Sequence, residues 1–171
     1  MEMVQQAYPV KLFTTTREFE GAYLPVGAPS GDINDPERGG LHLTDTTFTA
    51  LAQDSKFPPV SVPEIVVSKS DTIFFYFEDE STNEQFRLLA RTERVVVYTA
   101  ICALRGTFHL GVDQRLRTML DTMRGDFQPM TDVTIFPLLQ TRVAIPREKK
   151  MILINIKNIE LYHPIATEET E

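Results

Sequence analysis

Residues 94–110 read RVVVYTAICALRGTFHL, two runs of β-branched and aromatic residues with a short break between them. Runs of this kind are typical of β-strands, so the stretch predicts two consecutive strands joined by a turn. The segments that follow extend the pattern. RLRTMLDTM (115–123) has apolar residues at helical spacing, whereas DFQPMTDVTIFPLL (126–139) and KKMILINIKNIELYHP (149–164) are strand-like. The second half therefore predicts the order strand, strand, helix, strand, strand.

The first half predicts the same order. Its segments are YPVKLFTTT (8–16), EFEGAYLP (18–25), a helix-like TTFTALAQ (46–53), KFPPVSVPEIVVS (56–68) and DTIFFYFE (71–78). Aligning Gly21 with Gly106, 85 residues apart, also aligns Phe13 with Tyr98, Phe19 with Leu104 and Tyr23 with Phe108. Further along, Ile73–Phe77 matches Ile152–Ile156 at a separation of 79. These matches suggest a duplication.

The hexapeptide RGGLHL (38–43) returns as RGTFHL (105–110), but its separation of 67 fits neither alignment. We interpret residues 26–40 as an inserted loop, because they contain four glycines and two prolines. Such an insertion accounts for the shorter separation of the two hexapeptides. We therefore expect RGGLHL to lead the chain back into the first helix, and we expect Gly21 to be the true counterpart of Gly106.

The predicted fold class is mainly β with short helices (α+β). A small unit of this composition avoids exposed sheet edges by bending strongly or closing into a barrel. We expect two tandem small bent-sheet or barrel units, 1–88 with the insertion at 26–40 and 89–165, followed by an acidic flexible tail at 166–171. RLLARTER (87–94) is the expected short connection between them.

A resemblance supports this organisation. The ending ILINIKNIELYHP of the second half resembles the last strands of Sm-like and other SH3-like small barrels, and ICALRGTFHL resembles their second strand, which bends at a glycine. LRGTFHL, RLRTMLD, DFQPMTDVTIF and MILINIKNIELYHP together resemble an uncharacterised bacterial small-domain family of unknown function. The resemblance covers residues 94–164 well and 9–80 weakly. It implies fold and tandem organisation and supplies no catalytic residue.

Composition and charge restrict the class of protein. The 171 residues are 42% hydrophobic, which is enough for a core, and carry a net charge of −7, which disfavours binding to phosphate backbones. The charge is uneven, with 6 Lys and Arg against 14 Asp and Glu in residues 1–88, and 11 against 10 in residues 89–171. The start of the chain lacks the pattern of an export signal, and no segment has the apolar length of a membrane span. We expect a cytoplasmic protein without membrane insertion.

The residue patterns predict no enzyme, no cofactor and no metal. The chain lacks a G-x-x-x-x-G-K-[ST] loop, a G-x-G-x-x-G loop and a G-x-S-x-G elbow. Cys102, the single cysteine, lies in an apolar run and is expected to be a buried hydrophobe. The three histidines have no local metal spacing, although His42 and His109 could meet between the two units and share a metal with Asp45 or Asp113.

The function that this leaves is a noncatalytic structural, assembly or protein-interaction module acting in a homo- or hetero-oligomer. The expected interaction surface pairs basic residues of the second half with acidic residues of the first half: Arg115, Arg117, Arg124, Asp32, Asp35, Glu37, Glu78, Asp79 and Glu80. One alternative is a small-molecule or signal-binding pocket between the units, with the 26–40 loop as a lid. The other is RNA binding through the second unit, by analogy with Sm-like barrels.

Overall fold

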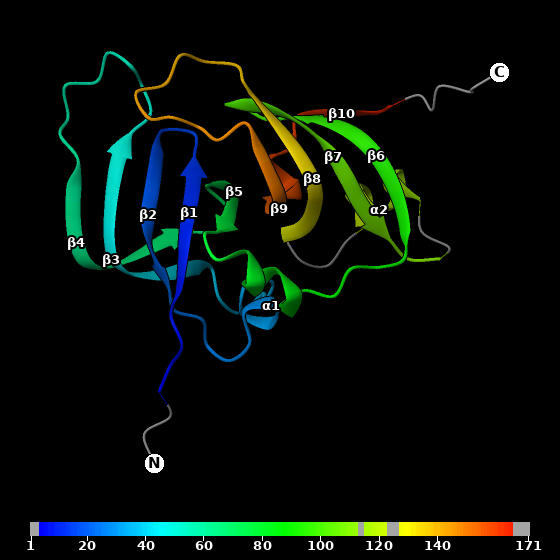
Figure 1. Cartoon of the computed structure of the whole chain (residues 1–171), viewed down its shortest axis with the longest axis horizontal. Helices are drawn as coiled ribbons and strands as arrows, with labels where there is room; N and C mark the ends of the chain where they lie inside the picture. Colours follow the sequence, from blue (N-terminus) through cyan, green and yellow to red (C-terminus); the bar gives the residue numbers. More distant parts are fainter. Residues whose placement is uncertain (1–3, 113–114, 123–126, 166–171) are drawn as a thin grey trace.

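The computed structural model describes residues 4–112, 115–122 and 127–165, and its main feature is one antiparallel sheet of ten strands (Figure 1). The first half of the chain contributes β1 (Tyr8–Thr14), β2 (Arg17–Tyr23), β3 (Gly40–Ala50), β4 (Val60–Ser68) and β5 (Thr72–Phe77). The second half contributes β6 (Arg91–Tyr98), β7 (Cys102–Leu110), β8 (Phe127–Pro137), β9 (Glu148–Asn155) and β10 (Leu161–Pro164). The mainly β class predicted from the sequence is confirmed.

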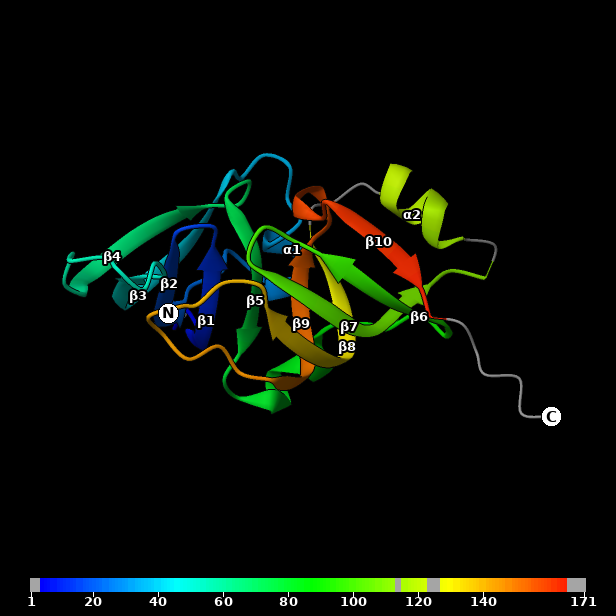
Figure 2. The ribbon, with the colours of Figure 1, turned by 90° about the horizontal axis from the view of Figure 1, so that it is seen from above.

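The strands follow the spatial order β10-β6-β7-β8-β9-β5-β1-β2-β3-β4. Each half therefore occupies one continuous part of the sheet, and the two parts meet where β9 lies beside β5. The sheet curves strongly but is not closed, and β4 and β10 lie at its opposite ends (Figures 1 and 2). The sequence predicted bent sheets or barrels, and this sheet is not closed into a barrel.

Short helices occupy the connections. They are α1 (Pro29–Asp32), α2 (Leu116–Thr122) and the 3₁₀ turns η1 (Glu80–Gln85) and η2 (Ile156–Asn158). The helix predicted at 115–123 is present as α2, with Leu116 buried. The helix of the first half is α1, which lies inside the 26–40 segment expected to be a loop, and Pro29 suits the first turn because its missing N–H needs no partner there.

The helix predicted at 46–53 is wrong, because most of this segment belongs to β3. Phe48 and Leu51 have helical spacing, but the threonines before and between them are β-branched and favour extended backbone. β3 pairs with β2 on one side and with β4 on the other, from Gly40 opposite Ser68 to Phe48 opposite Val60. RGGLHL accordingly leads into β3, whereas RGTFHL lies within β7.

The proposed equivalence of Ile73–Phe77 with Ile152–Ile156 is also incorrect. β5 and β9 are neighbouring strands, with Phe74 opposite Ile154 and Phe75 opposite Leu153. Along the chain, β9 is the fourth strand of its half, as β4 is of the other, while β5 and β10 are the fifth strands. The two segments resemble each other because both are buried central strands.

Two buried clusters form the core, and each draws side chains from both halves. The first is built mainly from β6–β9 and includes Phe13, Leu51 and Phe74 of the first half. The second is built mainly from β1–β5 and includes Phe127 and Leu153 of the second half. The halves therefore share apolar burial across the β5–β9 junction, and the boundary at residues 88 and 89 stays a prediction.

Gly21 and Gly106 both lie at a β-bulge. The register shifts opposite Gly21 between β2 and β3, and opposite Gly106 between β7 and β8. A Cβ on Gly21 would lie 2.2 Å from Oγ1 of Thr46, and one on Gly106 would lie 2.9 Å from the carbonyl oxygen of Thr131. Only glycine permits this close approach of the two strands.

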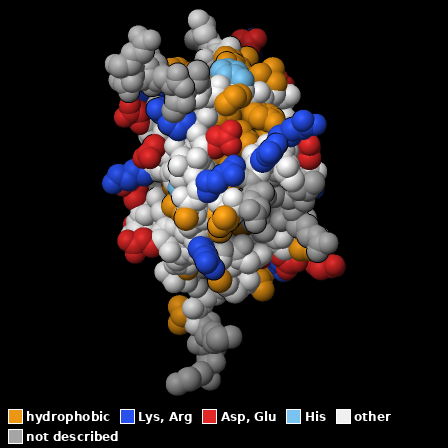
Figure 3. Space-filling view, turned by 90° about the vertical axis from the view of Figure 1, so that its right-hand side faces the viewer, with side chains coloured by type: hydrophobic (Ala, Val, Ile, Leu, Met, Phe, Trp, Pro, Cys, Tyr) orange, Lys and Arg blue, Asp and Glu red, His pale blue; other side chains and the backbone are white. Residues whose placement is uncertain are grey.

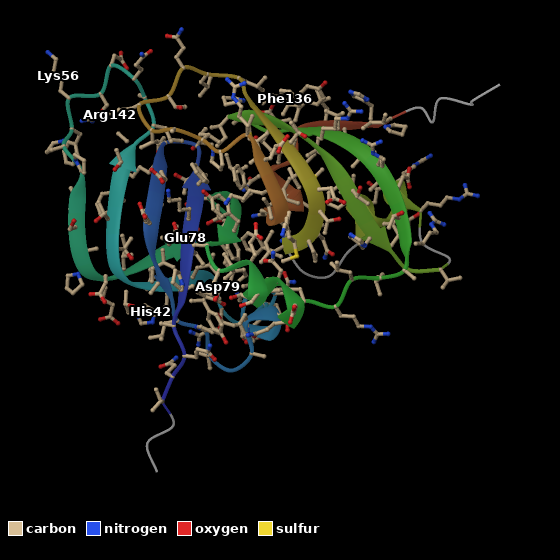
Figure 4. All side chains as sticks on the ribbon, viewed as in Figure 1. His42, Lys56, Glu78, Asp79, Phe136 and Arg142 are labelled. Carbon is tan, nitrogen blue, oxygen red and sulfur yellow. The ribbon has the colours of Figure 1, made fainter. Side chains whose placement is uncertain are left out.

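Two further contacts join the halves outside the sheet. The Asn34 side chain accepts a hydrogen bond from the Phe127 N–H (2.9 Å) and donates one to the Phe127 carbonyl (3.0 Å). At the other end, the loop after β8 packs on the loop after β3, where Arg142 Nη1 donates to the carbonyl of Phe57 at 2.5 Å (Figure 4). The 26–40 segment is thus attached to the second half.

Candidate functional site at the open edges of the sheet

β4 forms one open edge of the sheet. It pairs with β3 along one side, and among the described residues no strand pairs with its other side. Val66 on this strand is 67% exposed, although its neighbour Val67 is buried in the second core cluster. Glu64, on the same strand, forms an ion pair with His42 of β3, with 2.6 Å between Oε1 and Nε2. The β4 edge therefore presents an apolar side chain beside free backbone groups.

β10 forms the other open edge. It pairs with β6 from Leu161 opposite Tyr98 to Pro164 opposite Val95, and no described strand lies on its other side. Leu161 is 54% exposed, and Tyr162 is half-buried against the first core cluster. The face of the molecule that carries β6 and β10 shows a group of hydrophobic side chains beside a histidine (Figure 3). Both edges thus combine unpaired backbone with exposed apolar surface.

Prolines limit how much of each edge can pair. Pro63 lies in the first part of β4, and Pro164 is the last residue of β10. Proline has no N–H to donate to a ladder and is found on edge strands, where it blocks uncontrolled pairing. The backbone that remains able to pair is short, centred on Val66 and Val67 in β4 and on Leu161 and Tyr162 in β10.

One of the acidic residues predicted for the interaction surface, Asp32, is buried. Asp32 is only 4% exposed; its carboxylate accepts a hydrogen bond from the Tyr23 hydroxyl and forms an ion pair with Arg38, with 2.9 Å between Oδ1 and Nε. The prediction that Asp32 belongs to an interaction surface is therefore wrong, because its buried carboxylate binds Tyr23 and Arg38 of the same chain and is not accessible to another protein. Burial and the Asp32 carboxylate together raise the pKa of Tyr23 above its usual value. Asp35 is half-buried and Glu37 is exposed.

The other acidic group, Glu78 to Glu80, lies at the end of β5 and the start of η1 (Figure 4). All three residues are exposed. Asp79 caps η1 by accepting from the N–H and the hydroxyl of Ser81, and these hydrogen bonds lower its pKa. Glu80 pairs with Lys150 of β9, with 3.0 Å between Oε2 and Nζ. This group therefore contacts the second half of the same chain.

Of the predicted basic residues, Arg115 precedes α2 and Arg117 lies on it, and both are exposed. Arg124 lies outside the described residues, as do Asp113 and the 166–171 segment expected to be a tail.

The two histidines considered as metal ligands, His42 and His109, have other partners in the structure. His109 is within hydrogen-bonding distance of Thr131 Oγ1 (2.7 Å) and of the Leu89 carbonyl (3.2 Å), while His42 pairs with Glu64. Their strands, β3 and β7, are separated in the sheet by five others. No group of three or more potential metal ligands occurs among the described residues. Cys102 is buried, and burial raises the pKa of its thiol to about 11.

The cavities are open grooves lined by mixed side chains. One of about 440 Å³ is bordered by Glu80, Asp132, Glu148, Lys149 and Lys150, and another of about 380 Å³ lies between residues 4–8 and 25–27. The loop proposed as a lid is attached to Phe127 through Asn34 and buries Ile33. A binding pocket between the halves stays a prediction.

Sequence reasoning did not single out Val66 or Leu161. Their signal was present, since IVV at 65–67 and LY at 161–162 are short apolar runs, each close to a proline. An apolar residue in a strand is usually buried, however, and only the strand order reveals that these two lie on open edges.

Among the described residues, no helix has the length and apolar character needed to cross a bilayer. No family model matches the chain, and no curated protein and no solved structure is found to be similar to it.

Proposed function

We propose that the protein is a noncatalytic assembly module whose open sheet edges bind strands of neighbouring protein chains. One observation carries this proposal: β4 and β10 are unpaired on their outer sides, and each exposes an apolar side chain at the middle of its free backbone. Unpaired edges are templates for strand addition unless they are covered or blocked. The prolines restrict the free backbone but do not remove it.

We also propose that the chain consists of two tandem units of the same topology. The strand orders β5-β1-β2-β3-β4 and β10-β6-β7-β8-β9 are the same when strand numbers differ by five. The first hairpin of each unit supports the equivalence. Oγ1 of Thr14 accepts from the N–H of Arg17 at 3.1 Å, and Oγ1 of Thr99 accepts from the N–H of Cys102 at 3.2 Å. These turns are 85 residues apart.

The bulges support the same equivalence. Asp45 and Asp132, 87 residues apart, both have positive φ, 47° and 51°, and each lies opposite its glycine, Gly21 or Gly106. Few residues other than glycine adopt this backbone, and aspartate is among those that do. Two independent strands would have little reason to place the same rare conformation at the same bulge.

The test of the assembly function is the mass of the protein in solution as a function of concentration. Sedimentation velocity or light scattering is expected to show a mass above that of the monomer, which increases with concentration. Val66→Glu places a charge on the β4 edge and is expected to reduce the mass. Val26→Glu, at a site 55% exposed and outside the strands, is the matched control and should change nothing. A wild-type protein that stays strictly monomeric would contradict the proposal.

A further inference from the structure

β5 and β9 pair within the chain at the junction of the two proposed units. This junction therefore shows which strand register and which side-chain contacts join the edge of one unit to the edge of another. At this junction Phe74 of β5 lies opposite Ile154 of β9, and Phe75 lies opposite Leu153. Of these four side chains, two cross the junction. Phe74, from the first unit, packs in the cluster built mainly by the second, and Leu153, from the second unit, packs in the cluster built mainly by the first. All four residues are at most 1% exposed.

The tandem equivalence identifies the counterparts of these residues on the open edges. Phe13 pairs with Phe74 and Tyr98 pairs with Leu161, so Leu161 takes the place of Phe74 and Tyr162 that of Phe75.

The other side of the junction follows in the same way. His42 and Pro129 are 87 residues apart, as the two bulge aspartates are, and are therefore counterparts. His42 pairs with Val66 and Pro129 pairs with Leu153, so Val66 takes the place of Leu153 and Val67 that of Ile154. All four counterparts are 87 residues away, which is also the separation of the two bulge aspartates.

The counterparts of the two crossing side chains are the exposed ones. Leu161, in the place of Phe74, is 54% exposed, and Val66, in the place of Leu153, is 67% exposed. Val67, in the place of the inward-facing Ile154, is buried within its own unit. Exposure at the open edges therefore falls on the two positions whose equivalents are buried only because another unit is present.

We infer that the partner of the open edges is a second copy of this chain, and that β4 of one copy pairs antiparallel with β10 of the next in the register of the internal junction. This inference rests on the proposed assembly function. Tyr162 then lies opposite Val66 of the second copy, and Leu161 lies opposite its Val67. Val66 and Leu161 each pack against the core of the neighbouring copy.

Charge favours the same arrangement. The β4 edge belongs to the half with 6 Lys and Arg against 14 Asp and Glu, and the β10 edge belongs to the half with 11 against 10. Joining β4 to β10 therefore brings unlike halves together, whereas joining β4 to β4 would place two acidic halves side by side. Because the two surfaces differ, the contact is heterologous and continues from copy to copy into a ring or a filament.

The contact between copies is expected to be weaker than the internal one. Asn155, at the end of β9, donates to the Lys69 carbonyl at 2.9 Å, and Asn158, in η2, donates to the Thr72 carbonyl at 2.7 Å. The two amides thus attach the end of β9 and η2 to the turn before β5 and to the first residue of β5. Their counterparts 87 residues earlier are Ser68 and Asp71. A carboxylate cannot donate to a carbonyl, and the Ser68 hydroxyl sits on a shorter side chain than the Asn155 amide, so the edge at β4 lacks the two amide attachments.

The experiment is site-directed disulfide formation in the full chain. Val66→Cys with Tyr162→Cys places thiols on opposite edges, and mild oxidation is expected to yield a ladder of covalent oligomers. Val66→Cys with Leu139→Cys is the matched control, since Leu139 is exposed but lies outside the strands, and it should not yield the ladder. Native Cys102 is buried and remains in all variants.

A second measurement does not depend on introduced thiols. Leu161→Glu and Val66→Glu should each reduce self-association in sedimentation velocity. Ser68→Asn with Asp71→Asn should strengthen it on the order of tenfold, because it supplies side-chain amides at the positions equivalent to Asn155 and Asn158. Self-association that persists in both Glu variants, without a ladder in the cysteine variant, would overturn the inferred register and leave the assembly function standing. A wild-type chain that remains monomeric at every concentration would overturn both.

Discussion

Replacing Asn34 by alanine tests how strongly the two halves depend on each other. The Asn34 amide makes two hydrogen bonds to the backbone of Phe127, 2.9 Å from the N–H and 3.0 Å to the carbonyl oxygen, and Phe127 itself is 0% exposed. Alanine removes both partners at once. The Phe127 N–H and carbonyl then lose these hydrogen bonds.

The size of the effect follows from those two groups. A buried backbone group left without a partner costs about 1–3 kcal/mol. Because Asn34 is only half-buried, the lower end applies to each group, and the loss totals about 2 kcal/mol. With a urea dependence of about 2 kcal/mol per molar, the midpoint of unfolding falls by about 1 M.

The assay is equilibrium urea unfolding followed by circular dichroism, with Asn83→Ala as the matched control. The side-chain oxygen of Asn83 accepts no hydrogen bond from the described residues, so its replacement should move the midpoint little. A midpoint for Asn34→Ala that equals the midpoint of Asn83→Ala would refute the reasoning. It would mean that the 26–40 segment covers the second half without stabilising it.

Three further predictions concern stability and reactivity. Burial raises the pKa of Glu18, which is 8% exposed, so folding is penalised at neutral pH. Glu18→Gln should therefore increase the free energy of unfolding at pH 7. The increase should shrink as the pH falls through the raised pKa of Glu18 and should vanish below the usual pKa of 4.5. Urea unfolding midpoints of both proteins at several pH values measure this. Cys102 is buried and its pKa is raised to about 11, so a thiol reagent should label it slowly in the native protein and rapidly in urea, and equal rates would contradict its burial. Gly106→Ala should destabilise the protein by about 1–3 kcal/mol in thermal or urea unfolding, because the new Cβ meets the Thr131 carbonyl at 2.9 Å and backbone moves less easily than a side chain. An unchanged transition for this variant would contradict the close packing of the bulge.

The prolines at the open edges limit aggregation in the proposed assembly. Edges that pair without restriction make indefinite sheets, and the prolines at positions 63 and 164 shorten the backbone that can pair. What remains matches the internal junction, which itself pairs only two residues of each strand. A short contact of this kind depends on side chains that fit, which gives specificity to a surface that backbone pairing alone would not.

The amino-acid sequence by itself was sufficient for the features that depend on near neighbours. The β-branched run at 94–98 and the apolar spacing at 115–123 form a strand and a helix in the structure, because these preferences act within a few residues. The sequence also predicted that Gly21 corresponds to Gly106, and both glycines lie at bulges. A mainly β fold follows from such local signals.

Tertiary structure decided everything that depends on which strands become neighbours. Residues 46–50 are extended because β2 and β4 pair with them from both sides, and this pairing outweighs a short apolar spacing that favours a helix. Asp32 is buried because Arg38 and Tyr23 reach its carboxylate. Val66 and Leu161 are exposed because their strands end the sheet, whereas Leu153 and Phe74 are covered because β9 and β5 meet. Strand pairing joins residues that are far apart in the chain, so no local sequence pattern predicts which strands form the edges of the sheet.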